Sequence, residues 1–423
     1  MKALIIGSGL IGVTSAYFLA RRGWEVTVLD RQDGPALETS FANGSLLTPS
    51  MPEPWNAPGS WRVLLASIGR SDSPLQLRLK ALPHLAGWGV RFLRNSSRER
   101  YERNSLKNLR LGLHSLEVLQ RLRREIALDY GSAASGILRV FRDPAKLQGA
   151  IPWADRLKAE GITYRVMTGG EVAAMEPALA PISGQLAGGI HYPVDEIGNA
   201  YKFTVALAEH ARRAGVDFRF RTPVTGIETR LGRVTAVRGG DQQFTADSYV
   251  VAAGSYTPLL CGNLGITVPV RPAKGYSLTF ERPSPDIPFH LPVADDDFHA
   301  VVVPLENVIR VAGTAEFTGY DLSLSEVRIG NLVKLVRQVL PGWNLDPSKA
   351  KPWCGLRPMS ADGVPIIGPT PIGNLWINTG HGPLGWTMAV GSGQLLADLL
   401  TGGSPGLTPG AYALARFNGA ATR

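Results

Sequence analysis

The sequence predicts a mixed α/β and α+β protein, and three observations support this fold class. Residues 3–30 read as an apolar strand, a glycine-rich turn, a helix and a second strand that ends on Asp30. Residues 197–262 contain a further passage of helix and strands, and residues 351–423 return to strand, glycine-rich turn and helix. Residues 267–317 alternate between apolar and polar side chains, as antiparallel strands do. These patterns predict a Rossmann-like domain combined with an antiparallel-sheet domain and a helical insertion.

The glycines of the first turn form the motif Gly7-x-Gly9-x-x-Gly12. They let the backbone turn tightly and approach a pyrophosphate at the N-terminus of the following helix. Asp30 lies eighteen residues after Gly12, where an acidic side chain can accept a hydrogen bond from a ribose hydroxyl. The turn therefore predicts a dinucleotide site. An ordinary βαβ unit with a glycine-rich turn is the alternative interpretation.

Length and composition indicate a globular protein of two domains. The chain has 423 residues, of which 44% are hydrophobic, and no run of about 18 apolar residues predicts a membrane span. The first strand begins at residue 3 with no signal sequence before it, so we expect a cytoplasmic location. Cys261 and Cys354 are too few for a disulfide framework or a structural zinc site, and we expect no metal.

The net charge of +9 is concentrated in one segment. Residues 61–124 contain 14 Lys and Arg against four Asp and Glu, which gives +10, so the remaining residues sum to −1. The segment includes a basic amphipathic run from Leu75 to Trp88. A solvated helical face explains such a run, and contact with an anionic membrane or an electron-accepting partner is the functional alternative. No motif indicates nucleic-acid binding.

Hydrophobic periodicity and turn residues predict the remaining elements. Residues 36–60 are rich in Pro, Gly, Ser and Asn and predict a long functional loop. We expect helices at residues 86–127, 150–160, 201–214, 324–340 and 387–401, and strands at residues 164–167, 216–220, 234–238, 244–246, 249–254 and 375–378.

A second glycine-rich turn, Thr379-Gly-His-Gly-Pro-Leu-Gly-Trp-Thr387, follows a predicted strand and opens the last helix. It offers a second helix N-terminus with free backbone N–H groups. Such a site can stabilise the negative charge of a reduced flavin, whereas an NAD enzyme does not need it. The two glycine-rich turns together therefore favour FAD over NAD. A glycine-rich helix cap is the alternative interpretation of the second turn.

With these motifs the chain resembles the D-amino acid dehydrogenase family, one of the FAD-dependent amine oxidoreductases that include D-amino acid oxidase, glycine oxidase and sarcosine oxidase. The resemblance covers nearly the whole chain. Besides the two turns it rests on Glu38-Thr-Ser-Phe-Ala-Asn43-Gly, Pro54-Trp-Asn-Ala-Pro58-Gly, Pro193-x-Asp195-Glu196-x-Gly198, Pro272-x-Lys274-Gly-Tyr276-Ser, Ala312-Gly-Thr-Ala-Glu316 and Gly355-Leu-Arg357-Pro-Met-Ser-x-Asp362-Gly-x-Pro365. It implies oxidative deamination of a small amino acid, in which hydride transfer from Cα to flavin N5 gives an imine and then a keto acid.

The interleaved patterns predict a discontinuous FAD-binding domain and a substrate domain built from insertions. The FAD-binding domain is expected to comprise residues 1–60, 197–262 and 351–423. The substrate domain is expected to comprise residues 61–196 and 263–350, with a basic helical insertion at 61–130.

The resemblance implies catalytic roles for three residues. Arg357 is expected to hold the substrate carboxylate as a bidentate pair, which fixes the face of Cα that meets the flavin. Tyr276 is expected to cover the site and hydrogen-bond the same carboxylate, and His381 to lie in the glycine loop that faces the flavin. Arg271 and Lys274 complete the expected substrate-binding set. A structural or solvated position is the alternative for each side chain.

The expected FAD contacts come from short segments along the whole chain. They are Gly7, Gly9, Leu10, Ile11, Gly12, Asp30, Arg31, Ser40, Asn43, Gly44, Val224, Gly254, Gly382, Leu384, Gly385, Trp386 and Thr387. For Asn43 a turn role is the alternative. For Val224, which resembles a backbone contact to adenine, a core position is the alternative.

The chain departs from the family pattern in the loop after Asn43, at Arg271 and at Pro383. An added arginine near the substrate suits a second carboxylate, as in iminodiacetate; sarcosine and D-hydroxyproline are further secondary amines that stay open. Cys354 lies near the point where sarcosine oxidases attach flavin covalently, but its Gly-Leu-Arg context is typical of members that bind FAD non-covalently. The sequence does not choose among O₂, a quinone and a partner protein as electron acceptor.

Overall fold

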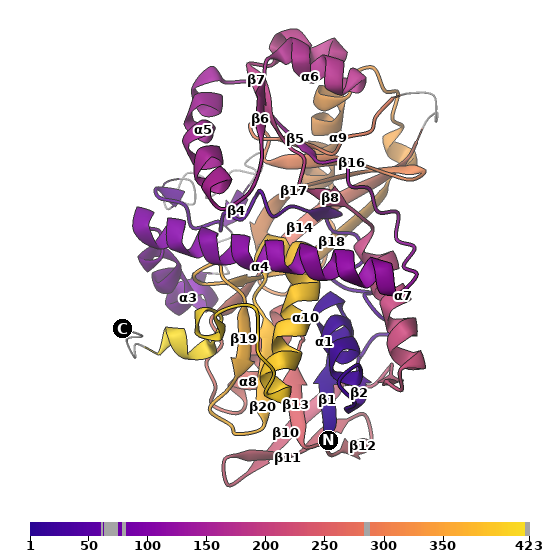
Figure 1. Ribbon diagram of the computed structural model, residues 1–423, viewed down its shortest axis with the longest axis vertical. Coiled ribbons are helices and arrows are strands. Elements are labelled where there is room, and N and C mark those ends of the chain that lie inside the picture. Colours follow the sequence, from indigo (N-terminus) through magenta and orange to yellow (C-terminus); the bar gives the residue numbers. More distant parts are fainter. Residues whose placement is uncertain (61, 63–74, 78–81, 283–287, 419–423) are drawn as a thin grey trace.

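The computed structural model places two large β-sheets in the lower and upper halves of the molecule, with helices around and between them (Figure 1). It describes residues 1–60, 62, 75–77, 82–282 and 288–418. The lower sheet has six strands and the upper sheet has nine, which confirms the mixed α/β and α+β class. Within these residues no helix is long and apolar enough to cross a membrane.

The six-stranded sheet has the order β19-β20-β13-β1-β2-β9, and all its pairs are parallel except β19 with β20. Its strands are β1 (Lys2–Ile6), β2 (Glu25–Leu29), β9 (Asp217–Arg219), β13 (Ser248–Val251), β19 (Ile366–Pro369) and β20 (Leu375–Thr379). β1 and β13 are buried along almost their whole length, because α1 (Leu10–Ala20), α7 (Ala200–Arg213) and α10 (Gly385–Thr401) cover one face of the sheet, and α8 (Thr257–Gly262) and the small sheet that contains β11 (Arg233–Gly239) cover the other. The carboxyl ends of β1, β13 and β20 therefore share one edge.

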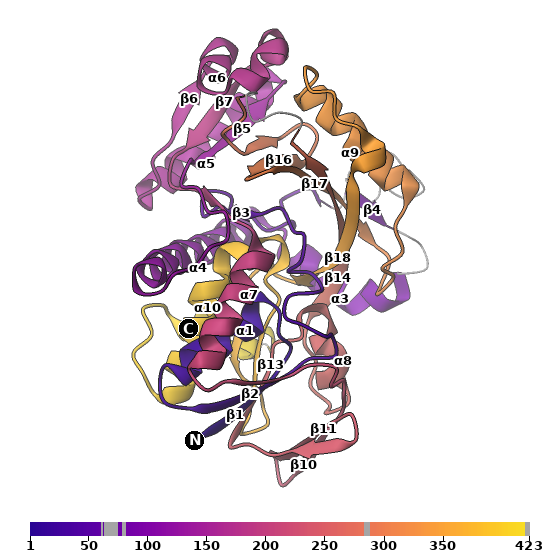
Figure 2. The ribbon, with the colours of Figure 1, turned by 90° about the vertical axis from the view of Figure 1, so that its right-hand side faces the viewer.

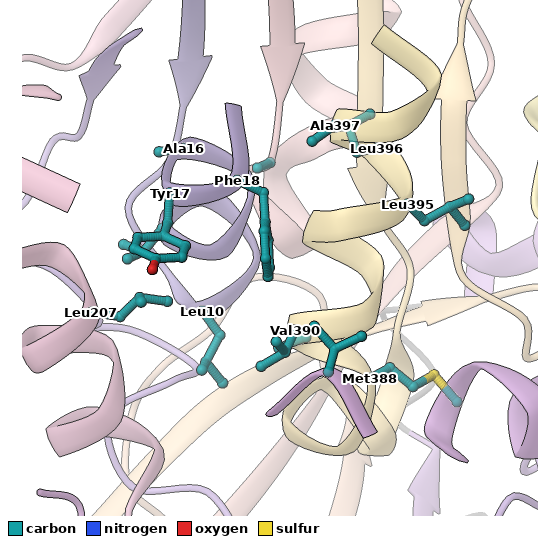
Figure 3. Close-up of a cluster of buried hydrophobic side chains, with 14 of the residues drawn as sticks. Leu10, Ala16, Tyr17, Phe18, Leu207, Met388, Val390, Leu395, Leu396 and Ala397 are labelled. Carbon is teal, nitrogen blue, oxygen red and sulfur yellow. The ribbon is translucent and has the colours of Figure 1, made fainter. Parts of the chain in front are cut away.

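Three helices bury their apolar side chains together on this sheet. They are α1 (Leu10–Ala20), α7 (Ala200–Arg213) and α10 (Gly385–Thr401). Figure 3 shows Tyr17 and Phe18 of α1 between Leu207 of α7 and Val390 of α10. Since α1 and α10 each begin where a parallel strand ends, their N-termini lie at the same edge of the sheet.

The nine-stranded sheet has the order β18-β14-β17-β16-β15-β5-β7-β6, with β4 paired to β17. Its strands are β4 (Leu75–Leu77), β5 (Ile137–Phe141), β6 (Arg165–Met167), β7 (Gly188–Tyr192), β14 (Val270–Glu281), β15 (Val293–Asp295), β16 (Ala300–Leu305), β17 (Val308–Phe317) and β18 (Lys351–Ser360). On one face, Leu332 and Val336 of helix α9 (Glu326–Val339) pack against Leu278 of β14. The opposite face is directed at the six-stranded domain, where Ser277 Oγ donates to the Ala42 carbonyl.

The smaller elements surround these two sheets. The strands are β3 (Leu46–Leu47) and β8 (Glu196–Ile197), which pair with each other, and β10 (Val224–Arg230), β11 (Arg233–Gly239) and β12 (Gln242–Phe244), which form a separate sheet. The helices are α5 (Pro144–Ala159), α6 (Gly169–Met175), α8 (Thr257–Gly262) and the 3₁₀ turns η2 (Pro177–Gln185), η3 (Gly254–Tyr256), η4 (Pro347–Lys349), η5 (Gly382–Leu384), η6 (Pro409–Ala411) and η7 (Leu414–Phe417).

The basic segment forms two helices, α3 (Leu82–Arg94) and α4 (Arg98–Glu125), where the sequence predicts one from residue 86 to residue 127. The break follows α3, whose last turn Asn95 caps with a side-chain hydrogen bond to Arg91 O. α4 runs across the middle of the molecule and packs on α10 (Figures 1 and 2). Trp88 of α3 is buried, and its Nε1 donates to Met359 O at 3.0 Å. The aromatic side of the amphipathic run therefore belongs to the protein core.

The pairing of β18 differs from the expected division of the chain. The sequence places residues 351–423 in the FAD-binding domain, but β18 pairs with β14 over ten residues, from Val270 with Ser360 to Thr279 with Lys351. The strand that carries Arg357 is thus an edge of the nine-stranded sheet. Of the basic segment, residues 61, 63–74 and 78–81 lie outside the described part of the chain.

Candidate active site

A cavity of about 790 Å³ lies between the two sheets. Its lining combines the turns that follow β1, β13 and β20, much of the loop at residues 36–55, and strands β14 and β18. The edge formed by the carboxyl ends of parallel strands is where open α/β sheets bind ligands. The volume is within the range of cofactor and ligand sites.

The first glycine-rich turn meets the geometric demands of a dinucleotide site. Gly7 has φ +107°, and a Cβ at Gly12 would overlap the Gly7 carbonyl oxygen, so both positions need glycine. Gly7, Gly9, Leu10 and Ile11 line the cavity at the N-terminus of α1. Gly12 is not among the lining residues, so its part is to let α1 pack closely on β1.

Asp30 lines the cavity at the end of β2. One carboxylate oxygen accepts from Ser8 N at 2.6 Å and Ser8 Oγ at 2.7 Å, and the other accepts from Gln32 N at 2.9 Å. The carboxylate thus connects the end of β2 to the first glycine-rich turn. Its contact with a ribose stays a prediction.

The neighbouring predicted FAD residues lie along the same cavity. Arg31 is paired with Glu38 at 2.6 Å and lies over the Tyr256 ring, with 4.0 Å between Cζ and the ring centroid. Ser40 Oγ accepts from Leu10 N at 3.1 Å, which connects the loop to the start of α1. The other lining residues from this set are Asn43, Gly44, Val224 and Gly254.

The second glycine-rich turn brings His381 into the cavity wall. Its side chain is buried, Nε2 is 2.9 Å from Ser392 Oγ, and Nδ1 has no hydrogen-bond partner. Burial lowers the pKa of His381 to about 3, so the imidazole is neutral at physiological pH. The residues after it that line the cavity are Gly382, Leu384, Gly385, Trp386 and Thr387, together with Pro383.

Two hydrogen bonds hold the second turn against the rest of the site. Trp386 Nε1 donates to Gly198 O at 3.0 Å, and Thr48 N donates to Thr387 Oγ1 at 3.0 Å. A Cβ at Gly198 would overlap the Tyr130 ring, which explains the glycine of the Asp195-Glu196-x-Gly198 motif.

Buried polar side chains fix the loop between these turns. Ser45 has φ +58°, and Arg310 Nη1 donates to its Oγ at 2.9 Å. Further on, Ser50 donates its N–H at 3.2 Å and its hydroxyl to the buried Asp195 carboxyl. Burial raises the pKa of Asp195 to about 8. These contacts hold the segment from Ser45 to Ser50 along the cavity.

Arg357 projects from β18 into the cavity. Its Nη1 donates to Thr314 O at 3.2 Å, and its Cζ lies 5.4 Å from the centroid of the Trp55 ring. In the described part of the chain no acidic side chain pairs with it. Burial lowers the pKa of Arg357 to about 10, so it stays charged at neutral pH. A desolvated cation without a carboxylate partner is suited to bind an anionic ligand.

Lys274 and Tyr276 point away from the cavity centre, which the sequence did not predict. Lys274 is buried, with its Nζ 3.1 Å from the Asp321 carboxylate and 3.6 Å from Glu316. The Tyr276 hydroxyl donates to Glu316 at 3.2 Å, and its ring joins the core beneath α9. Alternate residues of a strand face opposite sides, so it is Gly275 that faces Arg357. Tyr276 still borders the cavity, whereas Lys274 does not.

Arg271 and Cys354 also lie outside the cavity lining. Arg271 Nη1 donates to the Val270 carbonyl at 2.8 Å. Cys354 pairs with Tyr276 across the strands, and its Sγ is 3.1 Å from Leu322 O on the side of α9. The thiol is therefore not placed for attachment to a ligand in the cavity, in agreement with the expected non-covalent FAD.

The sequence analysis did not identify several residues that line the cavity or hold Arg357. Thr314, whose carbonyl holds Arg357, is a β-branched residue at φ +55°, a strained conformation typical of functional sites. Trp55, Gly275 and Glu53 also line the cavity. Trp55 and Gly275 stand inside motifs that the sequence had marked, but nothing in the sequence alone showed which member of each motif faces the ligand.

The residues present fit FAD. Two helix N-termini open into one cavity, and the turns before them contain glycines that a Cβ would obstruct or that have positive φ. Asp30 and Arg31 line the cavity just after β2, and the turn from His381 to Thr387 lines it after β20 and at the start of α10. An elongated dinucleotide needs such a succession of contacts.

Comparison with known proteins defines the class. Residues 2–399 match the model of the DAO family, described as FAD dependent oxidoreductase. The chain belongs to this family, and it is an FAD-dependent oxidoreductase.

Individual proteins are also similar to this chain in sequence or in fold. The chain is 42% identical over 418 residues to a D-amino acid dehydrogenase of Paramagnetospirillum magneticum, covering 99% of both chains. It is similar in fold to L-proline dehydrogenase from P. horikoshii, with a TM-score of 0.78, 18% identity and coverage of 99% and 97% of the two chains. It also resembles iminodiacetate oxidase from Chelativorans sp. BNC1, with a TM-score of 0.75, 21% identity and coverage of 97% and 98%.

Proposed function

We propose that the protein is an FAD-dependent dehydrogenase that oxidises the Cα–N bond of D-amino acids. The observation that carries the proposal is Arg357, a half-buried guanidinium that faces the cavity without an acidic partner in the described chain. The full-length similarity to a D-amino acid dehydrogenase supports the same substrate class.

In this reaction FAD supplies the acceptor of the hydride that leaves Cα. Arg357 binds the substrate carboxylate with two parallel hydrogen bonds, which fixes the orientation of Cα. Thr314 O and the Trp55 ring hold the guanidinium in place. His381 is neutral and adds no positive charge near the substrate amine. The neutral amine lone pair assists loss of the hydride, so no side chain has to act as general base.

The first prediction tests this function directly. The purified protein should be yellow and release FAD on acid or heat denaturation, because Cys354 is not positioned for attachment. Under anaerobic conditions a D-amino acid should bleach the flavin absorbance, whereas the L-enantiomer at the same concentration should not. Equal bleaching by both enantiomers, or by neither of them across a panel of side chains, would contradict the proposal.

We further propose that the basic helices contact an anionic membrane from the cytoplasmic side, where a membrane electron acceptor would be accessible. Val90 and Leu93 of α3 are 51% and 47% exposed, and the exposed Arg94, Arg98 and Arg100 follow them. Apolar side chains among arginines are typical of interfacial helices.

The second prediction concerns this surface. Binding to vesicles that contain anionic lipid should be strong at low salt and fall steeply as ionic strength rises, because surface charges are screened. Vesicle flotation checks it, with zwitterionic vesicles and the Arg94→Glu/Arg98→Glu double variant as controls. If the protein does not bind anionic vesicles at low salt, the basic residues of α3 and α4 form a solvated helical surface and not a membrane contact.

A further inference from the structure

The cavity has a second charged region besides Arg357. Glu53 of the long loop, Tyr101 of α4, Arg139 of β5 and Asp296 after β15 all line it. These residues come from four separate segments, so they form a built cluster and not a single acidic run. None of them belongs to the motifs that support the FAD site.

The charges of this cluster do not balance. Arg139 Nε donates to Asp296 at 2.8 Å, and a second nitrogen of the same guanidinium also contacts that carboxylate. Glu53 is farther away, with 3.7 Å between its Oε1 and Arg139 Nη1. One guanidinium thus faces two carboxylates and lies closer to Asp296, which leaves a formal charge of −1 centred on Glu53.

Glu53 is partly withdrawn from water. Its side chain is 20% exposed. Burial raises the pKa of Glu53, and the nearby Asp296 acts in the same direction, while Arg139 opposes the shift. A carboxyl group in this position gains more from a ligand that donates hydrogen bonds than a solvated carboxylate would.

The cluster lines the same cavity as Arg357. Trp55, whose ring lies 5.4 Å from the Arg357 guanidinium, is only two residues from Glu53. An extended segment advances about 7 Å over two residues, which is comparable to the length of a long amino-acid side chain. A substrate held by its carboxylate at Arg357 can therefore direct its side chain to Glu53.

We propose that Glu53 determines the side-chain specificity of this cavity and selects D-amino acids whose side chain ends in a cation, such as an ammonium or guanidinium group. This inference rests on the proposed function and specifies its substrate class. Arg271, the added arginine that was expected to bind a second substrate carboxylate, lies outside the cavity lining.

The third prediction compares two substrates of nearly equal shape. D-lysine and D-norleucine differ chiefly in the terminal ammonium group, so the ratio of their kcat/KM values reports on its recognition. The wild type should favour D-lysine, and Glu53→Gln should lower that ratio about 10- to 100-fold, with D-norleucine nearly unchanged. Glu53→Asp, which keeps the charge, should retain part of the preference. Anaerobic flavin reduction supplies the rates, and the ratio does not depend on the fraction of folded protein.

Glu306→Gln is the matched control, because Glu306 pairs with Lys202 at the surface, where it is 41% exposed. It should leave the ratio unchanged. An unchanged ratio in Glu53→Gln, or a wild type that prefers D-norleucine, would overturn the role of Glu53 while leaving D-amino acid oxidation intact. If no D-amino acid reduces the wild-type flavin, the proposed function itself fails.

Discussion

Replacing Arg357 with alanine should nearly abolish substrate oxidation while the protein still binds FAD. The guanidinium is the cation that faces the proposed carboxylate site, and it is half-buried. Loss of one partner from a desolvated charge pair costs about 2–5 kcal/mol, which corresponds to roughly 30- to several-thousand-fold in kcat/KM. FAD content should stay normal, because Arg357 belongs to β18 and is not a residue of either glycine-rich turn.

The variant Arg357→Lys tests whether substrate oxidation needs the planar guanidinium in addition to its positive charge. Lysine keeps the positive charge but has no planar fork, so it should recover only part of the activity. Anaerobic flavin reduction by the best D-amino acid measures both variants, with Arg213→Ala on the exposed side of α7 as control. Near wild-type kcat/KM in Arg357→Ala would mean that the carboxylate is bound elsewhere, and Arg139 would be the next residue to test.

The parts of the fold that depend on local sequence could be predicted. Gly7 and Gly12 require glycine for reasons confined to their own turn and to the residues that follow β13, and the pattern of the turn is visible within 30 residues. The second turn, from Thr379 to Thr387, is equally local. The two turns meet because β1 and β20 belong to one parallel sheet, which the repeated strand–turn–helix order already indicated.

The parts that depend on strand pairing were harder to predict. Residues 351–360 look like the start of the last nucleotide-binding segment, yet β18 pairs with β14. A sequence does not show which distant strand will be its neighbour. The break between α3 and α4 was missed although residues 94–100 are all polar and include Asn95, Ser96 and Ser97, residue types that are typical of turns and helix caps.

The prediction of the site was limited because the sequence did not show which side of its strand each side chain faces. The motif Pro272-x-Lys274-Gly-Tyr276 marked the right strand, but strand alternation turns Lys274 and Tyr276 toward the core beneath α9. A register shift between Gly275 and Tyr276 in the pairing with β17 further obscures the pattern. Glu53 could not be recognised at all, because its partners Arg139 and Asp296 are far away in sequence.

Gly275 should be as important for activity as the arginine that it faces. A Cβ at this position would overlap the Arg357 guanidinium, which extends over Gly275 from its own register position opposite Ala273. Gly275→Ala should therefore displace the guanidinium from Thr314 O and the Trp55 ring without removing its charge. A misplacement of about 1 Å in a substrate-positioning group can cost about 100-fold in rate.

FAD binding and the unfolding temperature show whether Gly275→Ala displaces the guanidinium or unfolds the protein. Gly275→Ala should bind FAD and unfold at nearly the wild-type temperature, because the obstructed atoms belong to a flexible side chain and not to backbone. Gly262→Ala is the matched control, since a Cβ there meets no atom within 4 Å. If Gly275→Ala oxidises D-amino acids at the wild-type kcat/KM, the guanidinium can move without loss, and close placement of Arg357 over β14 is not what orients the substrate.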